Sequence, residues 1–264
     1  MPAGVSGSGI RRPEGRKQQA SAVQETCTVS CVDILVVDIG GTGVKLRVST
    51  SDDVCRFPSG PDMTPDVLMA RIGEQTADWN YDVVSIGYPG TVVQGKAIGE
   101  PGNLGPGWVG FNFDAAFGRP VRLVNDAILQ ALGAYRTGRM LFLGLGTGVG
   151  SALVSEHVMI PLELGCLPHP SGGTLADHLG RAGRRAHGHD VWQQDVVETV
   201  PLLRDAMASD YVVLGGGNGR KVDPLPPRTY RGGRHDAFEG GIRLWEEYVE
   251  PHDATPPPVW RVVR

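Results

Sequence analysis

Three glycine-rich turns constrain the fold of this chain more than any other feature of its sequence. They span 38–43, 144–150 and 214–218, and each closes an apolar run typical of a strand: ILVVDI, MLFLGL or YVVLG. Glycine has no Cβ, so backbone N–H groups in such a turn can approach an anion closely. Because VNDA at 124–127 lies between the first two turns, we predict a divided phosphate-binding cleft and a phosphoryl-transfer function.

Composition excludes several other classes of protein. The 264 residues fit one large or two small domains, and 41% apolar residues permit a sizeable core. A net charge of -4 argues against a nucleic-acid partner, and no apolar run approaches the roughly 20 residues of a membrane span. The four scattered cysteines form no disulfide framework and the first residues lack an apolar signal core. We therefore expect a cytoplasmic protein.

Strand and helix patterns alternate along the chain, which predicts the α/β class. A hairpin is expected over 34–49, and Thr64-Pro65 has the pattern of an N-cap followed by the first residue of a helix. The expected strands are 81–90, 120–124, 140–146, 151–155 and 211–215, and the expected helices are 64–79, 126–136, 175–187, 191–207 and 237–249.

These elements predict a division of the chain. Residues 1–32 are read as a disordered extension and 251–264 as a Pro-rich tail. Residues 33–121 form a small α/β lobe, on which the C-terminal helix at 236–250 packs back, and 122–235 form a large α/β lobe. Strand-turn-strand units near Asp38 and again near Gly146 indicate a duplication of two similar halves.

Two stretches resemble known nucleotide-binding motifs but fail their requirements. The segment 90–97 nearly fits a P-loop, yet Ala97 stands where a hydroxyl must hold magnesium. We expect a hairpin turn there. The turn at 144–150 has glycines at alternate positions and precedes a strand pattern, whereas a dinucleotide fingerprint precedes a helix.

Seven short motifs occur in an order that suggests a family. They are DIGGTGVK (38–45), GYPG (87–90), PGNL (101–104), VNDA (124–127), LGTGVG (145–150), ELG (163–165) and LGGGN (214–218). The set, over about residues 34–248, resembles the ROK family of bacterial sugar kinases, most closely its glucokinase and polyphosphate glucokinase members. This resemblance implies two actin-like (ribonuclease H-like) α/β lobes around a central cleft.

The resemblance also implies roles on the acceptor side of the reaction. Asp126 would be the general base, within hydrogen-bond reach of the 6-hydroxyl of glucose. Asn103, Asn125, Asp126 and Glu163 match positions that bind sugar hydroxyls. The alternatives are that Asp126 is a helix N-cap, a role Asn125 could also fill, and that Glu163 is a surface carboxylate.

On the donor side, the resemblance implies that backbone amides hold the phosphates of ATP or polyphosphate. Asp38 would lie beside magnesium, through water. The first two turns would bind phosphate, and the third would lie near adenine and ribose. The residues implied are Gly40, Gly41, Thr42, Lys45, Gly146, Thr147, Gly148, Gly215, Gly216 and Gly217. The alternative for each glycine is a tight turn without a ligand.

The chain departs from the family pattern at Cys166, where the family's Glu-x-Gly-His motif has histidine. That histidine contacts sugar or joins a structural zinc in many members. The family's cluster of zinc-binding cysteines is absent as well, so no zinc site is expected. A basic stretch, 181–189, could guide polyphosphate, but a solvated helix face is the favoured reading.

Three functional classes remain in competition. The first is a hexose kinase, with glucose as the leading substrate and an N-acyl amino sugar, such as N-acetylmannosamine or N-acetylglucosamine, as the alternative. The second is a sugar-binding regulator, disfavoured because 1–32 lack a helical DNA-binding pattern. The third is a catalytically weak sugar-binding protein. Lobe closure over the substrate is expected, and homodimer formation, common in the family, is left open.

Overall fold

The computed structural model describes residues 32–156 and 158–245. Its first sheet has the order β3-β2-β1-β4-β7. The strands are β1 (Ile34–Gly40), β2 (Gly43–Val48), β3 (Cys55–Phe57), β4 (Val83–Tyr88) and β7 (Val121–Asn125). The hairpin expected over 34–49 is confirmed by β1 and β2, which pair antiparallel around the first glycine turn.

The second sheet has the order β10-β9-β8-β11-β12. Its strands are β8 (Met140–Leu145), β9 (Val149–Ser155), β10 (Val158–Leu162), β11 (Tyr211–Gly215) and β12 (Thr229–Arg231). In both sheets an antiparallel three-stranded meander is followed by two strands parallel to its first strand. The matching order and directions confirm the predicted duplication.

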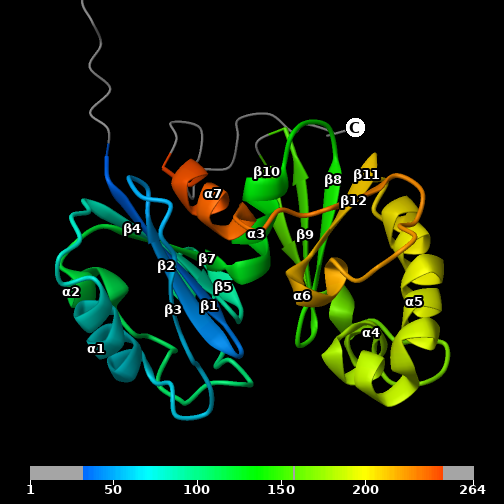
Figure 1. Cartoon of the computed structure of the whole chain (residues 1–264), viewed down its shortest axis with the longest axis horizontal. Coiled ribbons are helices and arrows are strands. Elements are labelled where there is room, and N and C mark those ends of the chain that lie inside the picture. Colours follow the sequence, from blue (N-terminus) through cyan, green and yellow to red (C-terminus); the bar gives the residue numbers. More distant parts are fainter. Residues whose placement is uncertain (1–31, 157, 246–264) are drawn as a thin grey trace, which may run out of the picture. The chain divides into compact units, whose positions relative to one another are not determined.

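Helices cover both sheets and fill the space between them. They are α1 (Pro65–Gln75), α2 (Phe113–Phe117), α3 (Asp126–Ala134), the 3₁₀ helix η1 (Leu164–Cys166), α4 (Leu175–Leu179), α5 (Arg181–Ala206), α6 (Gly216–Gly219) and α7 (Asp236–Arg243). Helices α1 and α2 lie outside the first sheet, α4 and α5 outside the second, and α3 and α7 between the two (Figure 1).

Strand alternation explains this layering. In β8, Leu141 and Leu143 belong to the core beneath α5, whereas Met140 and Phe142 pack with residues of α3. Successive side chains of a strand point to opposite faces, so a strand that is apolar throughout must be covered on both sides. The continuous apolar runs in the sequence therefore specify a sheet with helices on each face.

Glycines let α3 and α7 touch closely between the sheets. A Cβ on Gly133 of α3 would collide with the Asp236 carbonyl, and one on Gly240 of α7 with the Leu129 carbonyl. Helix α7 also meets the first sheet, where the Ser85 hydroxyl donates to the Gly241 carbonyl at 2.6 Å. The remainder of the helix predicted to reach 249 lies outside the described residues.

The prediction of one helix over 175–187 is wrong, because the chain breaks at Gly180. Gly180 is extended (φ -77°, ψ -172°) and separates α4 from α5. A Cβ there would lie 2.9 Å from the Thr147 carbonyl oxygen, so the break lets the helix pair approach the second glycine turn. Helix α5 is kinked at Gly188, whose φ is 80°.

The remaining expectations for the fold have mixed outcomes. The hairpin predicted at 90–97 is confirmed by β5 (Val92–Val93) and β6 (Lys96–Ala97). Strand β7 pairs with β4 in the first sheet, and the lobe boundary between 121 and 122 stays a prediction. Residues 1–31 and the tail at 251–264 lie outside the described residues. Within 32–156 and 158–245, no helix is both long and apolar enough to cross a membrane.

Candidate active site

A cleft of about 390 Å³ brings together residues from both sheets. The first glycine turn borders it at the end of β1, and the second borders it at the end of β8. The predicted site residues that line it are Gly40, Gly41, Thr42, Asn103, Asn125, Asp126, Gly146, Thr147, Gly148 and Glu163. The divided cleft expected from the glycine turns is therefore present.

Asp126 begins α3 without serving as its cap. The Asn125 side-chain oxygen accepts from the Ala127 amide at 2.9 Å, which is the capping bond. Gly87 of β4 admits this end of the helix, because a Cβ there would lie 2.7 Å from Leu129 Cδ2 and 3.4 Å from Asp126 Cα. The alternative reading of Asp126 as the N-cap is wrong, and its carboxylate is left to line the cleft.

The environment of Asp126 favours its protonated form. Burial, together with the negative charge of Asp38, raises the pKa of Asp126 to about 7, and Glu163 adds to the shift. The backbone amides of Ala127 and of Asp126 itself act in the opposite direction. A carboxyl group with a pKa near neutrality can exchange a proton at physiological pH, as a general base must.

Asp38 is not among the residues that line the cleft, and it is only 4% exposed. Lys45, directly opposite on β2, donates from Nζ to Asp38 Oδ2 at 2.6 Å. Magnesium prefers oxygen ligands, and the carboxylates of Asp38, Asp126 and Glu163 are close enough to interact electrostatically. This donor set fits magnesium, although Lys45 already neutralises one oxygen of Asp38.

Glu163 stands between β10 and η1 and is exposed to the cleft. The buried Ser151 hydroxyl fixes the backbone on both sides of it, donating to the Leu162 carbonyl at 2.8 Å and accepting from the Leu164 amide at 3.0 Å. Gly165 lets η1 rest on β9, because a Cβ would lie 2.8 Å from the Val149 carbonyl oxygen. Ser151 therefore positions Glu163, a role that the sequence did not reveal.

Asn103 reaches the cleft from a glycine- and proline-rich loop. A Cβ on Gly41 would lie 3.2 Å from Asn103 Nδ2, so the amide group faces the first glycine turn. Glu100 ties the loop together by accepting from the amides of Val109 at 3.1 Å and Trp108 at 3.1 Å. Hydrogen bonds from Val109 and the neighbouring amides lower the pKa of Glu100. The sequence predicted the loop but not this organising carboxylate.

The second glycine turn is held by the start of α5. The Arg181 amide donates to the Gly146 carbonyl at 2.9 Å, and the Gly146 amide donates to Gly148 at 3.0 Å. A Cβ on Gly146 would meet no heavy atom within 4 Å. Packing therefore does not require glycine at 146, in contrast to Gly215 and Gly216 of the third turn.

The third glycine turn does not line the cleft in the described part of the chain. A Cβ on Gly215 would collide with the Phe142 ring, and one on Gly216, whose φ is 72°, would lie 2.6 Å from the Leu145 carbonyl oxygen. Packing thus explains two of these glycines, while Gly217 has open space. Their role in binding a nucleotide stays a prediction, as does that of Lys45.

Comparison with known proteins places this geometry in context. No protein-family model matches the chain. The polyphosphate glucokinase of Mycobacterium tuberculosis is 25% identical over 214 residues, which cover 72% of this chain and 80% of that enzyme.

Two solved structures share the fold. The polyphosphate/ATP-glucomannokinase of Arthrobacter sp. strain KM aligns with a TM-score of 0.69 at 21% identity, over 80% of this chain and 97% of the other. A ROK family glucokinase from Streptomyces griseus, in complex with glucose and AMPPNP, aligns with a TM-score of 0.63 at 15% identity, over 80% and 98%.

The chain is thus similar in sequence to a polyphosphate glucokinase and in fold to sugar kinases that include a ROK family glucokinase. Its two α/β sheets and these structural neighbours agree with the two-lobe, actin-like fold class that the ordered motifs predicted. The Glu-x-Gly-His motif of ROK proteins is matched here at Glu163 and Gly165, and Cys166 stands in place of the histidine. The Cys166 side chain is exposed and is not among the described residues that line the cleft.

Further residues that were not assigned to the site from the sequence also line the cleft. They are Pro89, Gly90, Thr91, Val149, Gly150 and Arg181. Arg181 was considered only as part of the basic stretch, because its place at the cleft depends on the break at Gly180. Within that stretch Arg185, His187 and His189 are exposed, and Arg184 lies over the Trp192 ring at 5.7 Å.

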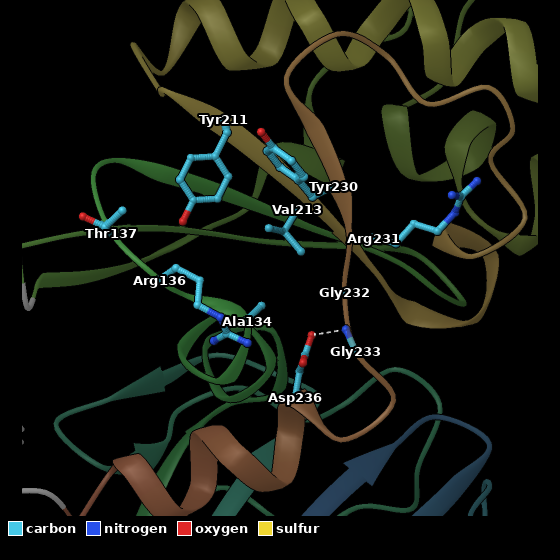
Figure 2. Close-up of a pocket in the computed structure, with 10 residues that line it drawn as sticks. All are labelled: Ala134, Arg136, Thr137, Tyr211, Val213, Tyr230, Arg231, Gly232, Gly233 and Asp236. Carbon is cyan, nitrogen blue, oxygen red and sulfur yellow. Dashed lines mark hydrogen bonds between the residues drawn. The ribbon is translucent and has the colours of Figure 1, made fainter.

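A second cavity, of about 580 Å³, contains none of the predicted site residues. It lies between the end of α3 and the strands β11 and β12, where Tyr211 and Tyr230 meet edge to face at 5.8 Å (Figure 2). The Asp236 carboxylate accepts from the Gly233 amide at 2.7 Å at its lower rim. Size alone therefore does not identify the candidate active site.

Proposed function

We propose that this protein is a sugar kinase that transfers a phosphoryl group to the 6-hydroxyl of glucose, with Asp126 as the general base. The observation that carries the proposal is the position of the Asp126 carboxylate. It lines a cleft bordered by two glycine turns, and Asn125 relieves it of capping α3. A phosphotransferase with an alcohol acceptor requires such a carboxylate beside the acceptor hydroxyl.

In this mechanism the oxygen of the sugar 6-hydroxyl attacks the terminal phosphorus of the donor. Asp126 accepts the proton that this hydroxyl loses. The bond between that phosphorus and the bridging oxygen breaks, and the shortened donor leaves with the electron pair. Asn103 and Glu163, which line the same cleft, bind and orient the sugar. Asn125 uses one lone pair for the cap and one amide hydrogen for the Gly90 carbonyl, so its second hydrogen remains for a sugar oxygen.

The two glycine turns hold the donor phosphates, with Gly41 and Thr42 on one side and Gly146 and Thr147 on the other. Asp38, with Asp126 and Glu163 nearby, would hold magnesium through water, and the ion would neutralise charge on the phosphates. The relatives named above support ATP and polyphosphate as donors. Residues 33–121 and 122–235 act as the small and large lobes, closing over the substrate.

A coupled assay tests the proposal. The full chain, with magnesium and either ATP or polyphosphate, is incubated with glucose, mannose or N-acetylmannosamine, and sugar phosphate is measured. We expect glucose 6-phosphate with the wild-type chain and a loss of 10²-fold or more in Asp126→Asn. Turnover only with N-acetylmannosamine would instead establish the amino sugar kinase.

Two further results would contradict the proposal. Turnover of Asp126→Asn close to wild type would remove Asp126 as the base. Saturable sugar binding by calorimetry, without turnover of any sugar, would establish a catalytically weak sugar-binding protein.

A further inference from the structure

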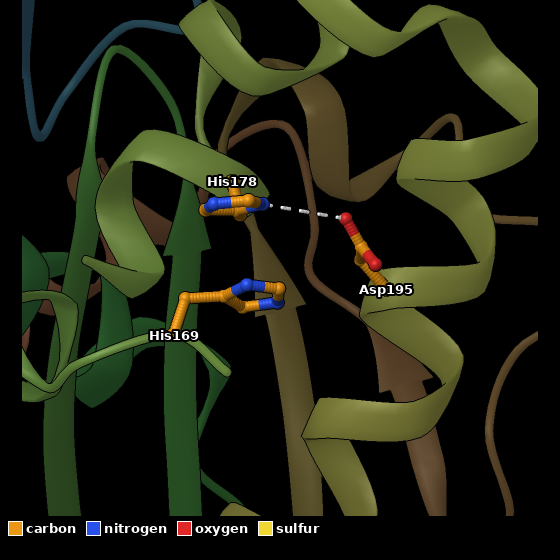
Figure 3. Close-up of side chains that lie close together, drawn as sticks. All are labelled: His169, His178 and Asp195. Atoms are coloured by element: carbon orange, nitrogen blue, oxygen red, sulfur yellow. Dashed lines mark ion pairs between the residues drawn. The ribbon is translucent and has the colours of Figure 1, made fainter. Parts of the chain in front are cut away.

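Two histidines and an aspartate meet on the side of the second sheet that α4 and α5 cover. His169 follows η1, His178 belongs to α4, and Asp195 belongs to α5 (Figure 3). One nitrogen of each imidazole and one carboxylate oxygen lie within 4.8 Å of one another. We call these three residues the His-Asp cluster.

The His178 ring is already oriented as a metal ligand would be. Its Nε2 lies 2.9 Å from the Gly172 carbonyl oxygen, which can only accept a hydrogen bond, so the proton resides on Nε2. Nδ1, which carries the lone pair when an imidazole is neutral, lies 3.7 Å from Asp195 Oδ2. Metal-bound histidines typically donate their second ring nitrogen to a carbonyl or carboxylate in this way.

The cluster is shielded from solvent without being closed. The side chains of His178 and Asp195 are 13% and 20% exposed. His169 stacks on His178 with ring centroids 3.6 Å apart, and the rings of His178 and His187 are also nearly parallel, 5.4 Å apart.

We propose that the His-Asp cluster binds a divalent transition metal ion, of the class that imidazole and carboxylate ligands hold, such as Zn²⁺ or Co²⁺. Ligand atoms around tetrahedral zinc are about 3.4 Å apart, given bonds of about 2.0–2.1 Å. The ligand atoms of the cluster lie within 4.8 Å of one another. Small side-chain shifts therefore bring them to the spacing of about 3.4 Å. Water or His187 completes the coordination.

Binding requires one rearrangement. The Ser171 amide donates to His169 Nδ1 at 3.2 Å, so in the metal-free protein the proton of this ring lies on Nε2. The ion can take Nδ1 in place of the Ser171 amide, or take Nε2 after the proton moves to Nδ1. In both cases this long hydrogen bond opens, and the loop at 169–173 shifts.

This site is not the zinc site of the ROK family. None of its three residues is the motif position held here by Cys166, and none is a cysteine. The expectation that no zinc binds rested on those missing ligands, and the proposal replaces it. The ion would join the loop after Glu163 to α5, whose first residue, Arg181, lines the cleft.

Cobalt provides the test, because Co²⁺ bound by nitrogen and oxygen in a tetrahedral site absorbs visible light. The full 264-residue chain, free of added histidines and stripped with a chelator, is titrated with Co²⁺ and then with Zn²⁺. We expect one equivalent of Co²⁺ to bind and Zn²⁺ to displace it. His178→Ala and Asp195→Asn should each weaken binding at least tenfold, and His189→Ala, an exposed histidine of α5, should bind as the wild type does.

Two controls separate the site from alternatives. Asp195→Asn preserves shape, so its melting temperature without metal should match that of the wild type, while the rise in melting temperature caused by Zn²⁺ should be lost. Cys27 and Cys31 are further side chains that could bind the ion. A double variant, Cys27→Ser with Cys31→Ser, should retain cobalt binding. No binding by the wild type, equal binding by Asp195→Asn, or binding lost only in the cysteine variant would overturn the proposal. These readouts do not depend on kinase activity.

Discussion

Asn125 caps the helix that Asp126 begins, so two adjacent polar residues divide two tasks. The Asn125 oxygen satisfies the Ala127 amide at 2.9 Å, and the Asp126 carboxylate lines the cleft. An aspartate that capped its own helix would be held in its charged form by the backbone amides. The division leaves Asp126 subject mainly to burial and to the charge of Asp38, which together raise its pKa.

Catalysis should depend on pH through Asp126. Its carboxylate must be deprotonated to act as the base, and burial beside Asp38 raises its pKa to about 7. We expect kcat/KM for glucose to be constant above about pH 8 and to fall about tenfold per unit below pH 6. Initial rates between pH 5.5 and 9 would check this, and a flat profile across that range would exclude Asp126 as the titrating base.

The same raised pKa should reduce stability as the pH rises. The folded state binds a proton at Asp126 more tightly than the unfolded chain, so this stabilisation is complete below about pH 4 and is lost as pH rises through about 7. We expect Asp126→Asn to raise the free energy of unfolding at pH 8 by on the order of 2 kcal/mol. Urea denaturation at pH 8 and at pH 4 measures this change in the free energy of unfolding. An equal change at both pH values would contradict the link between Asp126 protonation and stability.

Two glycines of the glycine-rich turns, Gly146 in the second and Gly216 in the third, should respond oppositely to alanine. Gly146 has open space around its Cβ position, so Gly146→Ala should keep the melting temperature but raise KM for the phosphoryl donor several-fold. Gly216→Ala should be destabilised by about 1–3 kcal/mol, because φ is 72° and Leu145 blocks the methyl group. Thermal unfolding and donor kinetics on both variants check this. A destabilised Gly146→Ala with unchanged KM would give the second turn a structural role alone.

Replacing Ser151 should weaken the binding of the sugar without weakening the binding of the donor. Its hydroxyl bridges Leu162 and Leu164 on either side of Glu163, and Ser151→Ala leaves a buried amide without its partner, at about 1–3 kcal/mol. We expect KM for glucose to rise at least several-fold while KM for the donor stays within twofold. Steady-state kinetics with each substrate varied would show it, and an equal rise in both would indicate general disruption of the cleft.

The sequence could predict those features that depend on local pattern. Apolar runs ending in glycine located β1, β8 and β11, and the VNDA motif located Asn125 and Asp126, which line the cleft. The residue that caps α3 was left open, because Asn125 and Asp126 have equal capping propensity. The short strands β3, β10 and β12 were not predicted, since three to five residues carry too little periodicity.

Contacts between distant segments could not be predicted from the sequence, for a different reason. The break at Gly180 depends on the backbone of Thr147, which lies on another element. Arg181 therefore could not be assigned to the cleft. The His-Asp cluster likewise joins 169, 178 and 195, whose spacing matches no metal-binding motif, and only the packing of α4 on α5 brings them together.

Gly133 and Gly240 are absent from the cleft, yet each occupies a point where one added methyl group would push α3 and α7 apart. Helix α3 packs against the second sheet and α7 against the first. The separation of the two sheets, and with it the distance between the two glycine turns that border the cleft, therefore depends on the absence of a side chain at these two positions. Gly133 lies at the opposite end of α3 from Asp126, so the width of the active site is determined at a distance from the chemistry it serves.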